Sequence, residues 1–457
     1  MSEQFKDQGG AATMDPSALL RWVTSKVMTY VISPKRLAKN RIKVEKQRQA
    51  NNQRHTVEYF HQVDDGYSHL AAQALAALAE RYDIDLQCHL VDGPAGANAP
   101  EPELLVNLSR YDASQIAPYY KLNFPENLGA PTTTLLKLAR SILANLNNQD
   151  FVAHVASVGH ALWSGSEVAL QELGKVHGFS SLEEEKAKYE NGNTRRDSLK
   201  HYSGAMFYYG GEWYWGIDRL YHLEQRLADL GADRLPDTSV IMPKQEVKAG
   251  RLRDNGSLTL EVFASVRSPY TAMIFDRALE LAKTTGVTLQ VRPILPMVMR
   301  GVSATREKGI YIFSDAAREA RASEVPFGQF YDPIGEPSRR CFSLYPWACT
   351  QGKGNELLSS FLSAAFAEGV NTSKEGGLRY VVEKAGLEWA SAKQVVGQNG
   401  WQDTLEENRL AMYESGLWGA PSFRLLDRNN KVVLALWGQD RLWLIAKEID
   451  RLLGEYV

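Results

Sequence analysis

The sequence predicts an α/β protein made of two consecutive copies of one unit. The chain has 457 residues, more than one ordinary hydrophobic core holds, so two or three domains are expected. One order of strands and helices can be followed twice along it. The pattern Trp-Gly-x-Asp-Arg-Leu also occurs twice, at residues 215–220 and 437–442.

The composition is that of a globular protein without a dominant charge. Fifty-two basic and 54 acidic residues give a net charge of −2, so nothing in the composition points to a nucleic-acid partner, and none is expected. Cys88, Cys341 and Cys349 are an odd number without a Cys-x-x-Cys pair, which disfavours a disulfide scaffold, a dithiol centre and a cysteine-rich metal site; no metal is predicted. The N-terminus lacks a secretory pattern, and no apolar run reaches the roughly 18 residues of a membrane span. We expect a cytoplasmic protein that acts on a small molecule.

Residues 1–54 are predicted to form an N-terminal arm. The stretch ALLRWVTSKVMTYVI has apolar residues at helical spacing, and the stretch after it is strongly basic. Two interpretations stay open. One is a helix on a membrane surface. The favoured one is an arm that packs on the body or on a second subunit, followed by a solvated charged segment.

The first unit is predicted over residues 55–232. Alternating β-formers predict a strand, a run of strong helix formers predicts a helix, and a second strand follows. Helices are then expected before two short aromatic strands and a last helix. In order, these segments are residues 55–63, 66–82, 83–91, roughly 133–190, 205–215 and 216–230.

The second unit is predicted over residues 257–457, after a polar linker at 233–256 that carries proline and glycine. Its elements repeat the order of the first unit. They are a strand at 258–266, a helix at 268–286, a strand at 287–295, helices over roughly 308–415, a hairpin at 421–437 and a last helix at 440–454.

Matched positions support a duplication. Asp65 matches Ser268 at an offset of 203 residues, and Gly204 matches Gly419 at an offset of 215. The offset drifts because loops tolerate insertions. Each unit then combines a parallel strand pair with an antiparallel hairpin in one mixed sheet. This is a thioredoxin-like arrangement with a helical insertion between its βαβ and ββα halves, and we expect the two units to pack as an intramolecular pseudo-dimer.

Six segments in the second unit carry a family resemblance: SVRSPYT, VRPIL, KGIYIFSDAAREA, FLSAAFAEG, GAPSF and WGQDRL. Together they resemble the DsbA family, and within it the branch of 2-hydroxychromene-2-carboxylate isomerase and kappa-class glutathione transferases. The similarity covers Leu258–Val457 and, more weakly, His55–Leu230.

The resemblance implies glutathione as ligand or cosubstrate. It implies that Ser268 faces the glutathione sulfur, in the place where redox members carry Cys-x-x-Cys. It also implies that Pro421 follows a cis bond while Ala420 offers its backbone to the cysteinyl part, and that Asp440 meets the γ-glutamyl amino group. Tyr270 and Arg441, beside these positions, complete the predicted binding set.

Each of these residues also has a plain structural interpretation. A helix N-terminus favours a thiolate, but Ser268 before Pro269 is equally a good N-cap. Pro421 also suits the start of a hairpin strand. Asp440 suits the first turn of a helix, and the first unit has the same Asp-Arg pair.

Three features depart from the family pattern. Ser265 stands where many members have Asp, Arg267 replaces an apolar residue, and the loop PMVMRGVSATREKG lacks an expected Asn. Arg267 or Arg300 could hold a carboxylate instead, although a solvated arginine is the default.

The favoured function is a glutathione-dependent isomerase or transferase that acts on a small electrophilic, possibly aromatic, substrate. Tyr270, Tyr345 and Trp347 are its candidate apolar lining. The alternatives are a thiol–disulfide oxidoreductase, which needs a cysteine at the site, and a binding protein without catalysis. In the first unit Asp65 replaces Ser268, and the alignment sets Met206 against Pro421. We therefore predict that only the second unit binds a thiol.

Overall fold

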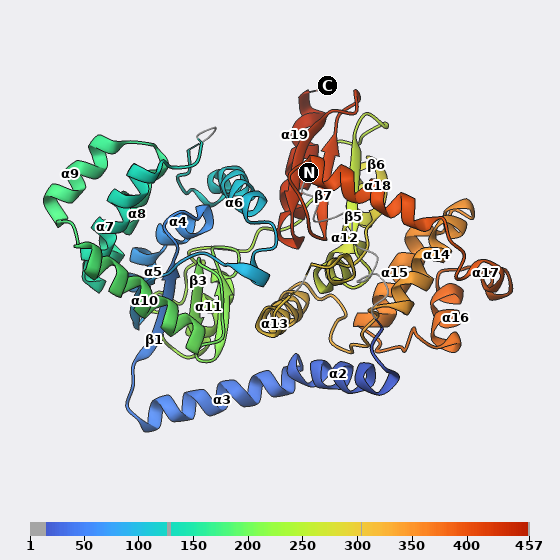
Figure 1. Ribbon diagram of the computed structural model, residues 1–457, viewed down its shortest axis with the longest axis horizontal. Coiled ribbons are helices and arrows are strands. Elements are labelled where there is room, and N and C mark those ends of the chain that lie inside the picture. Colours follow the sequence, from blue (N-terminus) through green and yellow to red (C-terminus); the bar gives the residue numbers. More distant parts are fainter. Residues whose placement is uncertain (1–14, 126–128, 303, 456–457) are drawn as a thin grey trace. The chain divides into compact units, whose positions relative to one another are not determined.

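The computed structural model describes residues 15–125, 129–302 and 304–455 (Figure 1). The chain divides into two compact units. One consists of Met1–Arg36 together with Glu246–Val457, and the other of Leu37–Gln245. We call them the C-terminal unit and the N-terminal unit. Each is described by itself below.

The N-terminal unit is built on a four-stranded sheet in the order β2-β1-β3-β4. Strands β1 and β2 are parallel, and β3 pairs antiparallel with β1 and with β4. Its elements are α3 (Pro34–Ala50, which starts in the other unit), β1 (His55–His61), α4 (Gly66–Ala72), α5 (Leu75–Arg81), β2 (Ile84–Leu90), η2 (Gly96–Asn98), α6 (Pro102–Ile116), η3 (Ala117–Tyr120), α7 (Thr133–Asn145), α8 (Asn148–Trp163), α9 (Glu167–His177), α10 (Leu182–Ser198), β3 (Met206–Tyr209), β4 (Glu212–Trp215) and α11 (Leu220–Asp229).

The C-terminal unit has a sheet of the same kind in the order β6-β5-β7-β8, again one parallel pair and one antiparallel hairpin. Helices α12 and α19 contact each other and pack on β5 and β7 respectively. Its elements are α2 (Ala18–Val31), β5 (Thr259–Ala264), α12 (Pro269–Thr285), β6 (Thr288–Pro293), η4 (Met297–Arg300), α13 (Arg306–Ala322), α14 (Glu336–Thr350), α15 (Gly354–Phe366), α16 (Glu375–Lys384), α17 (Trp389–Val395), α18 (Trp401–Glu414), β7 (Ser422–Leu426), β8 (Val432–Trp437), η5 (Gln439–Arg441) and α19 (Leu442–Glu455).

The predicted fold class is confirmed: two mixed four-stranded sheets, each interrupted by a helical insertion, follow one another in the chain. Side-chain contacts repeat as well. Tyr67 Oη donates to Asp112 Oδ2 over 2.9 Å in the N-terminal unit, and Tyr270 Oη donates to Asp315 Oδ2 over 2.9 Å in the C-terminal unit. Both members of the pair are offset by 203 residues, so the two units use one packing scheme between the crossover helix and the helix after the second strand.

Two elements differ from the sequence-based prediction. The helix predicted over 66–82 is interrupted at Gln73 and Ala74, between α4 and α5. Helix α6 was not predicted, although Pro102 at its first position is a typical start signal. The basic segment predicted to be solvated is helix α3, which has no buried residue, and Arg41 on it forms a bidentate ion pair with Glu212 of 2.7 and 2.8 Å.

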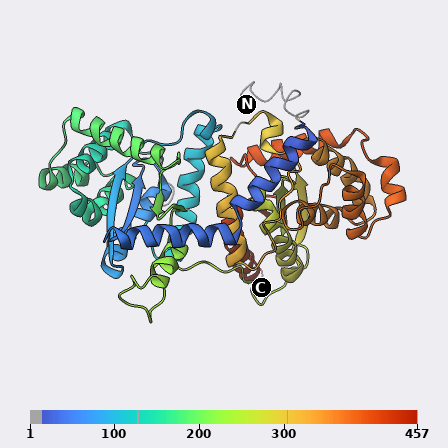
Figure 2. The same ribbon diagram turned by 90° about the horizontal axis from the view of Figure 1, so that it is seen from below.

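Helix α2 lies against α13 and the segment after it, as Figure 2 shows for the blue and gold helices. The buried guanidinium of Arg21 donates to Asp332 O and Ile334 O over 2.8 and 2.6 Å. The hydroxyl of Ser25 accepts from Asp332 N over 3.0 Å. Helix α2 is therefore part of the C-terminal unit, whereas α3 belongs to the N-terminal unit from Leu37 onward. Among the described residues, the helices fall short of the length and apolarity that crossing a membrane requires.

Candidate functional site

Ser268 begins helix α12 and joins it to the turn before β7. Its Oγ accepts from Thr271 N over 3.1 Å, which caps the helix, and donates to Ala420 O over 2.9 Å. Pro269 occupies the first helical position, where its missing N–H costs nothing. Ser268 is therefore the N-cap of α12, and its hydroxyl also bonds Ala420, which lies 152 positions away in the chain.

The turn at Ala420 is fixed by the Trp-Gly motif of the other hairpin strand. The Ala420–Pro421 bond is cis, as the resemblance implied. Pro421 O accepts from Gly438 N over 2.9 Å. A Cβ added at Gly419 would lie 2.6 Å from Trp437 Nε1, so only glycine lets the indole pack against this turn. The segments GAPSF and WGQDRL thus form one structural assembly.

Two arginines near the turn bind groups of the protein itself. Arg267 donates to both carboxylate oxygens of Asp332 over 2.8 and 3.0 Å, and this partner helps to raise the pKa of its guanidinium against the effect of burial. Arg300 is buried and donates from Nη2 to Trp418 O over 2.9 Å. Arg267 does hold a carboxylate by a bidentate contact, but that carboxylate is Asp332.

The remaining members of the predicted binding set have different positions. The Tyr270 hydroxyl bonds Asp315 in α13, at the N-terminal end of α12. Asp440 lies half-buried in η5, which packs on α12, and accepts from Gln439 Nε2. Arg441 is 1% exposed, like its counterpart Arg219. Because both units bury this arginine, a role in the fold explains Arg441 better than ligand binding; its binding role stays a prediction.

The candidate lining residues and the cysteines lie in other places. Tyr345 Oη donates to Val291 O in the middle of edge strand β6, over 3.3 Å. Trp347, half-buried, follows in the same helix α14. Cys341, also in α14, is fully buried, and burial raises the pKa of its thiol. Cys349, in the last turn of the same helix, is solvent-exposed. Cys341 and Cys349 therefore both belong to α14, and not to the segment around Ser268.

In the N-terminal unit, Asp65 takes the position of Ser268. Its Oδ2 accepts from Ser68 N over 2.8 Å and from Ser68 Oγ over 2.9 Å, so it caps α4 as Ser268 caps α12. Burial raises the pKa of Asp65 to about 6, and these hydrogen bonds oppose the rise. The helix N-terminus in this unit thus holds the protein's own carboxyl group.

The predicted match of Met206 with Pro421 is wrong by one residue. Met206 pairs with Phe60 and Trp215, whereas the residue that pairs with Phe263 and Trp437 is Ser422. Ala205 therefore matches Pro421, and its carbonyl accepts from Gly216 N over 2.7 Å as Pro421 O does from Gly438. Strand pairing fixes the alignment of the two units here, whereas the alignment made from the sequence pattern alone was shifted by one residue. By the same offset, Gly204 matches Ala420 and not Gly419.

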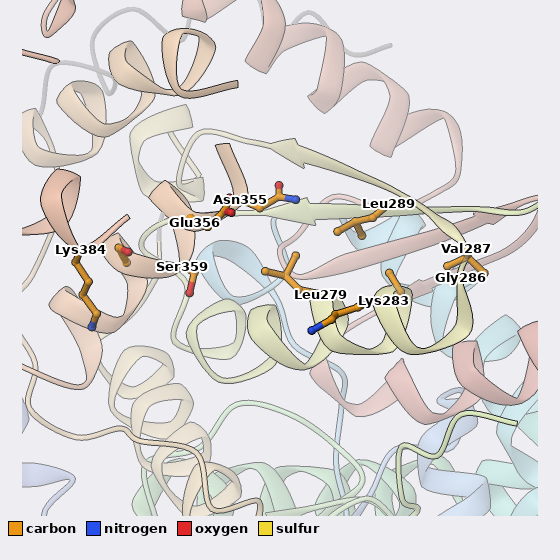
Figure 3. Close-up of a pocket in the computed structure, with 11 residues that line it drawn as sticks. Leu279, Lys283, Gly286, Val287, Leu289, Asn355, Glu356, Ser359 and Lys384 are labelled. Atoms are coloured by element: carbon orange, nitrogen blue, oxygen red, sulfur yellow. The ribbon is translucent and has the colours of Figure 1, made fainter. Parts of the chain in front are cut away.

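A separate hollow of about 680 Å³ lies in the C-terminal unit (Figure 3). It is lined by the C-terminal part of α12 from Leu279 onward and the following Gly286 and Val287, by α15, by Leu289 of β6 and by Lys384 of α16. At about 1.5 Å per residue, the eleven residues from Ser268 to Leu279 span roughly 16 Å. The hollow is therefore distinct from the Ser268 site.

Three residues of this region were not predicted. Asp332 binds Arg267, and no local pattern links residues 65 positions apart. Thr271 has a buried hydroxyl without a hydrogen-bond partner among the described residues. Lys308 lies seven residues before Asp315, hence on the same face of α13, and burial lowers its pKa. Of these three residues, only Lys308 could have been found from the sequence, because it is the first residue of the family-like segment KGIYIFSDAAREA.

Comparisons with known proteins concern the C-terminal unit. A family model of the DSBA-like thioredoxin domain matches residues 259–450. A 2-hydroxychromene-2-carboxylate isomerase of Sphingobium xenophagum is 24% identical over 196 residues, which are 40% of this chain and 94% of the relative.

Two solved structures are similar over the same share of the chain. One is a 2-hydroxychromene-2-carboxylate isomerase, with 20% identity and a TM-score of 0.37, covering 43% of this chain and 97% of that one. The other is the cytosolic disulfide reductase DsbM of Pseudomonas aeruginosa, with 16% identity and a TM-score of 0.34, covering 43% and 98%. From the matching family model and the strand order, residues 259–450 of this chain are a DsbA-like thioredoxin domain.

Proposed function

We propose that the C-terminal unit is a glutathione-dependent isomerase or transferase for a small electrophilic substrate. The observation that carries the proposal is the hydrogen bond of 2.9 Å from Ser268 to Ala420, which brings a helix N-terminus and a strand-like turn together. A serine at this point supports thiol binding and gives no means of disulfide exchange. The relative from Sphingobium xenophagum is named as an isomerase, which supports the isomerase part of the proposal.

The residues of the chain have separate roles in this proposal. The Ser268 hydroxyl turns its proton from Ala420 to the ligand sulfur and, with the positive end of the α12 dipole, lowers the thiol pKa. The backbone of Ala420 pairs with the ligand as a neighbouring strand would. Glutathione would supply the sulfur nucleophile that adds reversibly to an unsaturated substrate. Lys308 and Tyr270 on the α12–α13 side are candidates to orient that substrate.

We further propose that the two units arose by duplication and that the N-terminal unit no longer binds a thiol. Identical strand orders and the repeated tyrosine–aspartate pair support the duplication. A carboxylate at the α4 N-terminus would repel a thiolate. Ala205 in place of Pro421 leaves that turn without proline. The repeated Trp-Gly motif would then remain because it fastens the hairpin to the turn in both units.

The test is calorimetric titration of the full chain with glutathione at pH 7.5. The variant Ser268→Ala removes the hydroxyl and should weaken binding at least tenfold, equivalent to about 1.4 kcal/mol. Because this change also removes a helix cap, Ser166→Ala serves as the matched control: Ser166 caps α9 through Ala169 N over 3.2 Å in the other unit. Equal affinity of Ser268→Ala and wild type would contradict the proposal.

A second measurement separates the alternatives. A variant with all three cysteines changed to serine should keep the glutathione affinity and any isomerase or transferase activity. Loss of a thiol–disulfide exchange activity in that variant would instead support the oxidoreductase. A wild-type chain that binds no glutathione at millimolar concentration would leave the unit as a binding protein of another specificity.

A further inference from the structure

Thr271, in the first turn of helix α12, carries a buried hydroxyl next to the Ser268 site. The residue is 0% exposed, and within the described part of the chain its Oγ1 has no hydrogen-bond partner. Its backbone N–H donates to Ser268 Oγ over 3.1 Å, so the two hydroxyl-bearing residues are one helical turn apart. A buried hydroxyl that makes no hydrogen bond lowers stability, which points to a role beyond packing.

The N-terminal unit shows what a hydroxyl at this position can do. Ser68 follows its helix cap, Asp65, by three residues, as Thr271 follows Ser268, and both pairs of matched positions are 203 residues apart. Ser68 donates twice to one oxygen, Asp65 Oδ2: from its backbone N–H over 2.8 Å and from its hydroxyl over 2.9 Å. A hydroxyl three residues after the cap therefore reaches the side chain of the cap.

Thr271 can make the same contact with the oxygen of Ser268. Threonine in a helix divides between two χ1 rotamers, and in the arrangement that Ser68 adopts the hydroxyl lies beside the residue's own N–H. For Thr271, that N–H already donates to Ser268 Oγ. A serine oxygen has two lone pairs and one proton. Since Ser268 Oγ accepts from Thr271 N and donates to Ala420 O, its contacts within the described residues leave one lone pair for a second donor.

We propose that Thr271 is a positioning residue for the thiol: its hydroxyl donates to Ser268 Oγ when Ser268 donates to the glutathione sulfur. This inference rests on the proposed function of the C-terminal unit. Ser268 then uses its proton and both lone pairs, and Ala420 O is released to pair with the ligand backbone.

The effect of Thr271 on the sulfur is indirect. A hydroxyl that accepts from two donors is polarised by them and becomes a stronger donor itself. Ser268 therefore stabilises the glutathione thiolate more than the neutral thiol, and the thiol releases its proton to water. Because Thr271 is 0% exposed, it acts through Ser268 and does not touch the sulfur.

The test compares two ligands in the full chain at pH 7.5. Glutathione can form a thiolate, whereas S-methylglutathione, a thioether, cannot. Thr271→Val removes the hydroxyl and keeps the shape of the side chain. It should weaken the calorimetric affinity for glutathione roughly three- to tenfold, the loss expected for one hydrogen bond, and leave the affinity for S-methylglutathione unchanged. Ultraviolet titration of the bound thiol should show its pKa raised by about half a unit or more. Thr271→Ser keeps the hydroxyl and should restore both values.

Thr372, between α15 and α16, provides a matched control in the same unit. It is 1% exposed, and its Oγ1 also has no hydrogen-bond partner among the described residues, so Thr372→Val removes a comparable hydroxyl away from Ser268. This variant should keep the wild-type affinity for glutathione and the wild-type thiol pKa.

The outcomes separate this inference from the function on which it rests. If wild type binds glutathione and Thr271→Val matches it in affinity and thiol pKa, the role of Thr271 is overturned and the proposed function stands. Equal losses for glutathione and S-methylglutathione would overturn that role too, since they would show a purely structural effect. Wild type that binds no glutathione would overturn the proposed function and this inference together.

Discussion

Ser268 and Asp65 occupy the same backbone position in the two units and offer different chemistry to a ligand. Each accepts a hydrogen bond from the amide three residues later, so each caps its helix. The hydroxyl of Ser268 can also donate, as it does to Ala420 O, whereas an ionised carboxylate only accepts. At the same helix N-terminus, the exchange of one side chain therefore replaces a hydroxyl that can donate by a carboxylate that only accepts.

The half-buried carboxyl of Asp65 should make stability depend on pH. Its pKa is raised to about 6 in the folded protein, so the folded state holds this proton more tightly than the unfolded state. The stabilisation is complete below about pH 4 and is lost as the pH rises through 6. Asp65→Asn keeps the acceptor without the charge. It should gain on the order of 2 kcal/mol relative to wild type between pH 4 and pH 7.5.

Chemical denaturation at pH 4, 5, 6 and 7.5 measures this difference. Asp237→Asn provides the control, because this aspartate is exposed and lies far from Asp65 in the chain. A stability difference between Asp65→Asn and wild type that stays constant over this range would show that burial does not hold the proton.

At the level of elements, the hairpin and its preceding turn depend on each other through Gly419 and Trp437. Gly419→Ala places a Cβ 2.6 Å from the indole nitrogen, so the ring must move, and we expect a loss of about 1–3 kcal/mol in unfolding free energy. In a Trp437→Ala background the same change should cost much less. Gly309 in α13 has no atom within 4 Å of an added Cβ, so Gly309→Ala is the control. Additive effects of the two changes would argue against the contact.

Helix α2 and the segment 330–334 form a second interdependent pair. Arg21→Met leaves the carbonyls of Asp332 and Ile334 without their donor and should cost about 2 kcal/mol. Hydrogen exchange is the direct measurement. The amides of Phe330 and Asp332, which donate to hydroxyls of α2, should lose protection. As the control, Lys26→Met on the exposed side of the same helix should leave the protection of these amides unchanged. If Arg21→Met also left it unchanged, the contacts of Arg21 would not be what holds α2 on the segment 330–334.

The sequence predicts those elements whose signal is local. Both sheets follow from alternating strands, and Ser268 with Pro269 marks the start of α12. The basic residues of α3 are typical of a solvated segment, and none of its residues is buried, but its ion pair with Glu212, 171 positions away, has no signal in the sequence. The Arg267–Asp332 pair and the one-residue shift at Ala205 are equally non-local, since tertiary pairing sets them. A pattern within one segment carries no information on such partners.

For the whole molecule, the two units predict one thiol site per chain, although the fold is present twice. The C-terminal unit offers a donor hydroxyl at Ser268 and a proline turn, and the N-terminal unit offers Asp65 and Ala205. At pH 7.5 Asp65 is mostly ionised, and like charges a few ångströms apart cost on the order of 1 kcal/mol or more where water is excluded.

Calorimetry or native mass spectrometry with glutathione should therefore give one bound ligand per chain at saturation. Ser268→Ala should remove that ligand, and Asp65→Ala should leave both the count and the affinity unchanged. The number of bound ligands is informative because the two units share a fold but differ at Ser268 and Asp65. If the fold alone were enough to bind a thiol, both units would bind one, and two ligands would be found per chain. Two equivalent sites, or a single site that survives Ser268→Ala and disappears with Asp65→Ala, would reverse the assignment of the units.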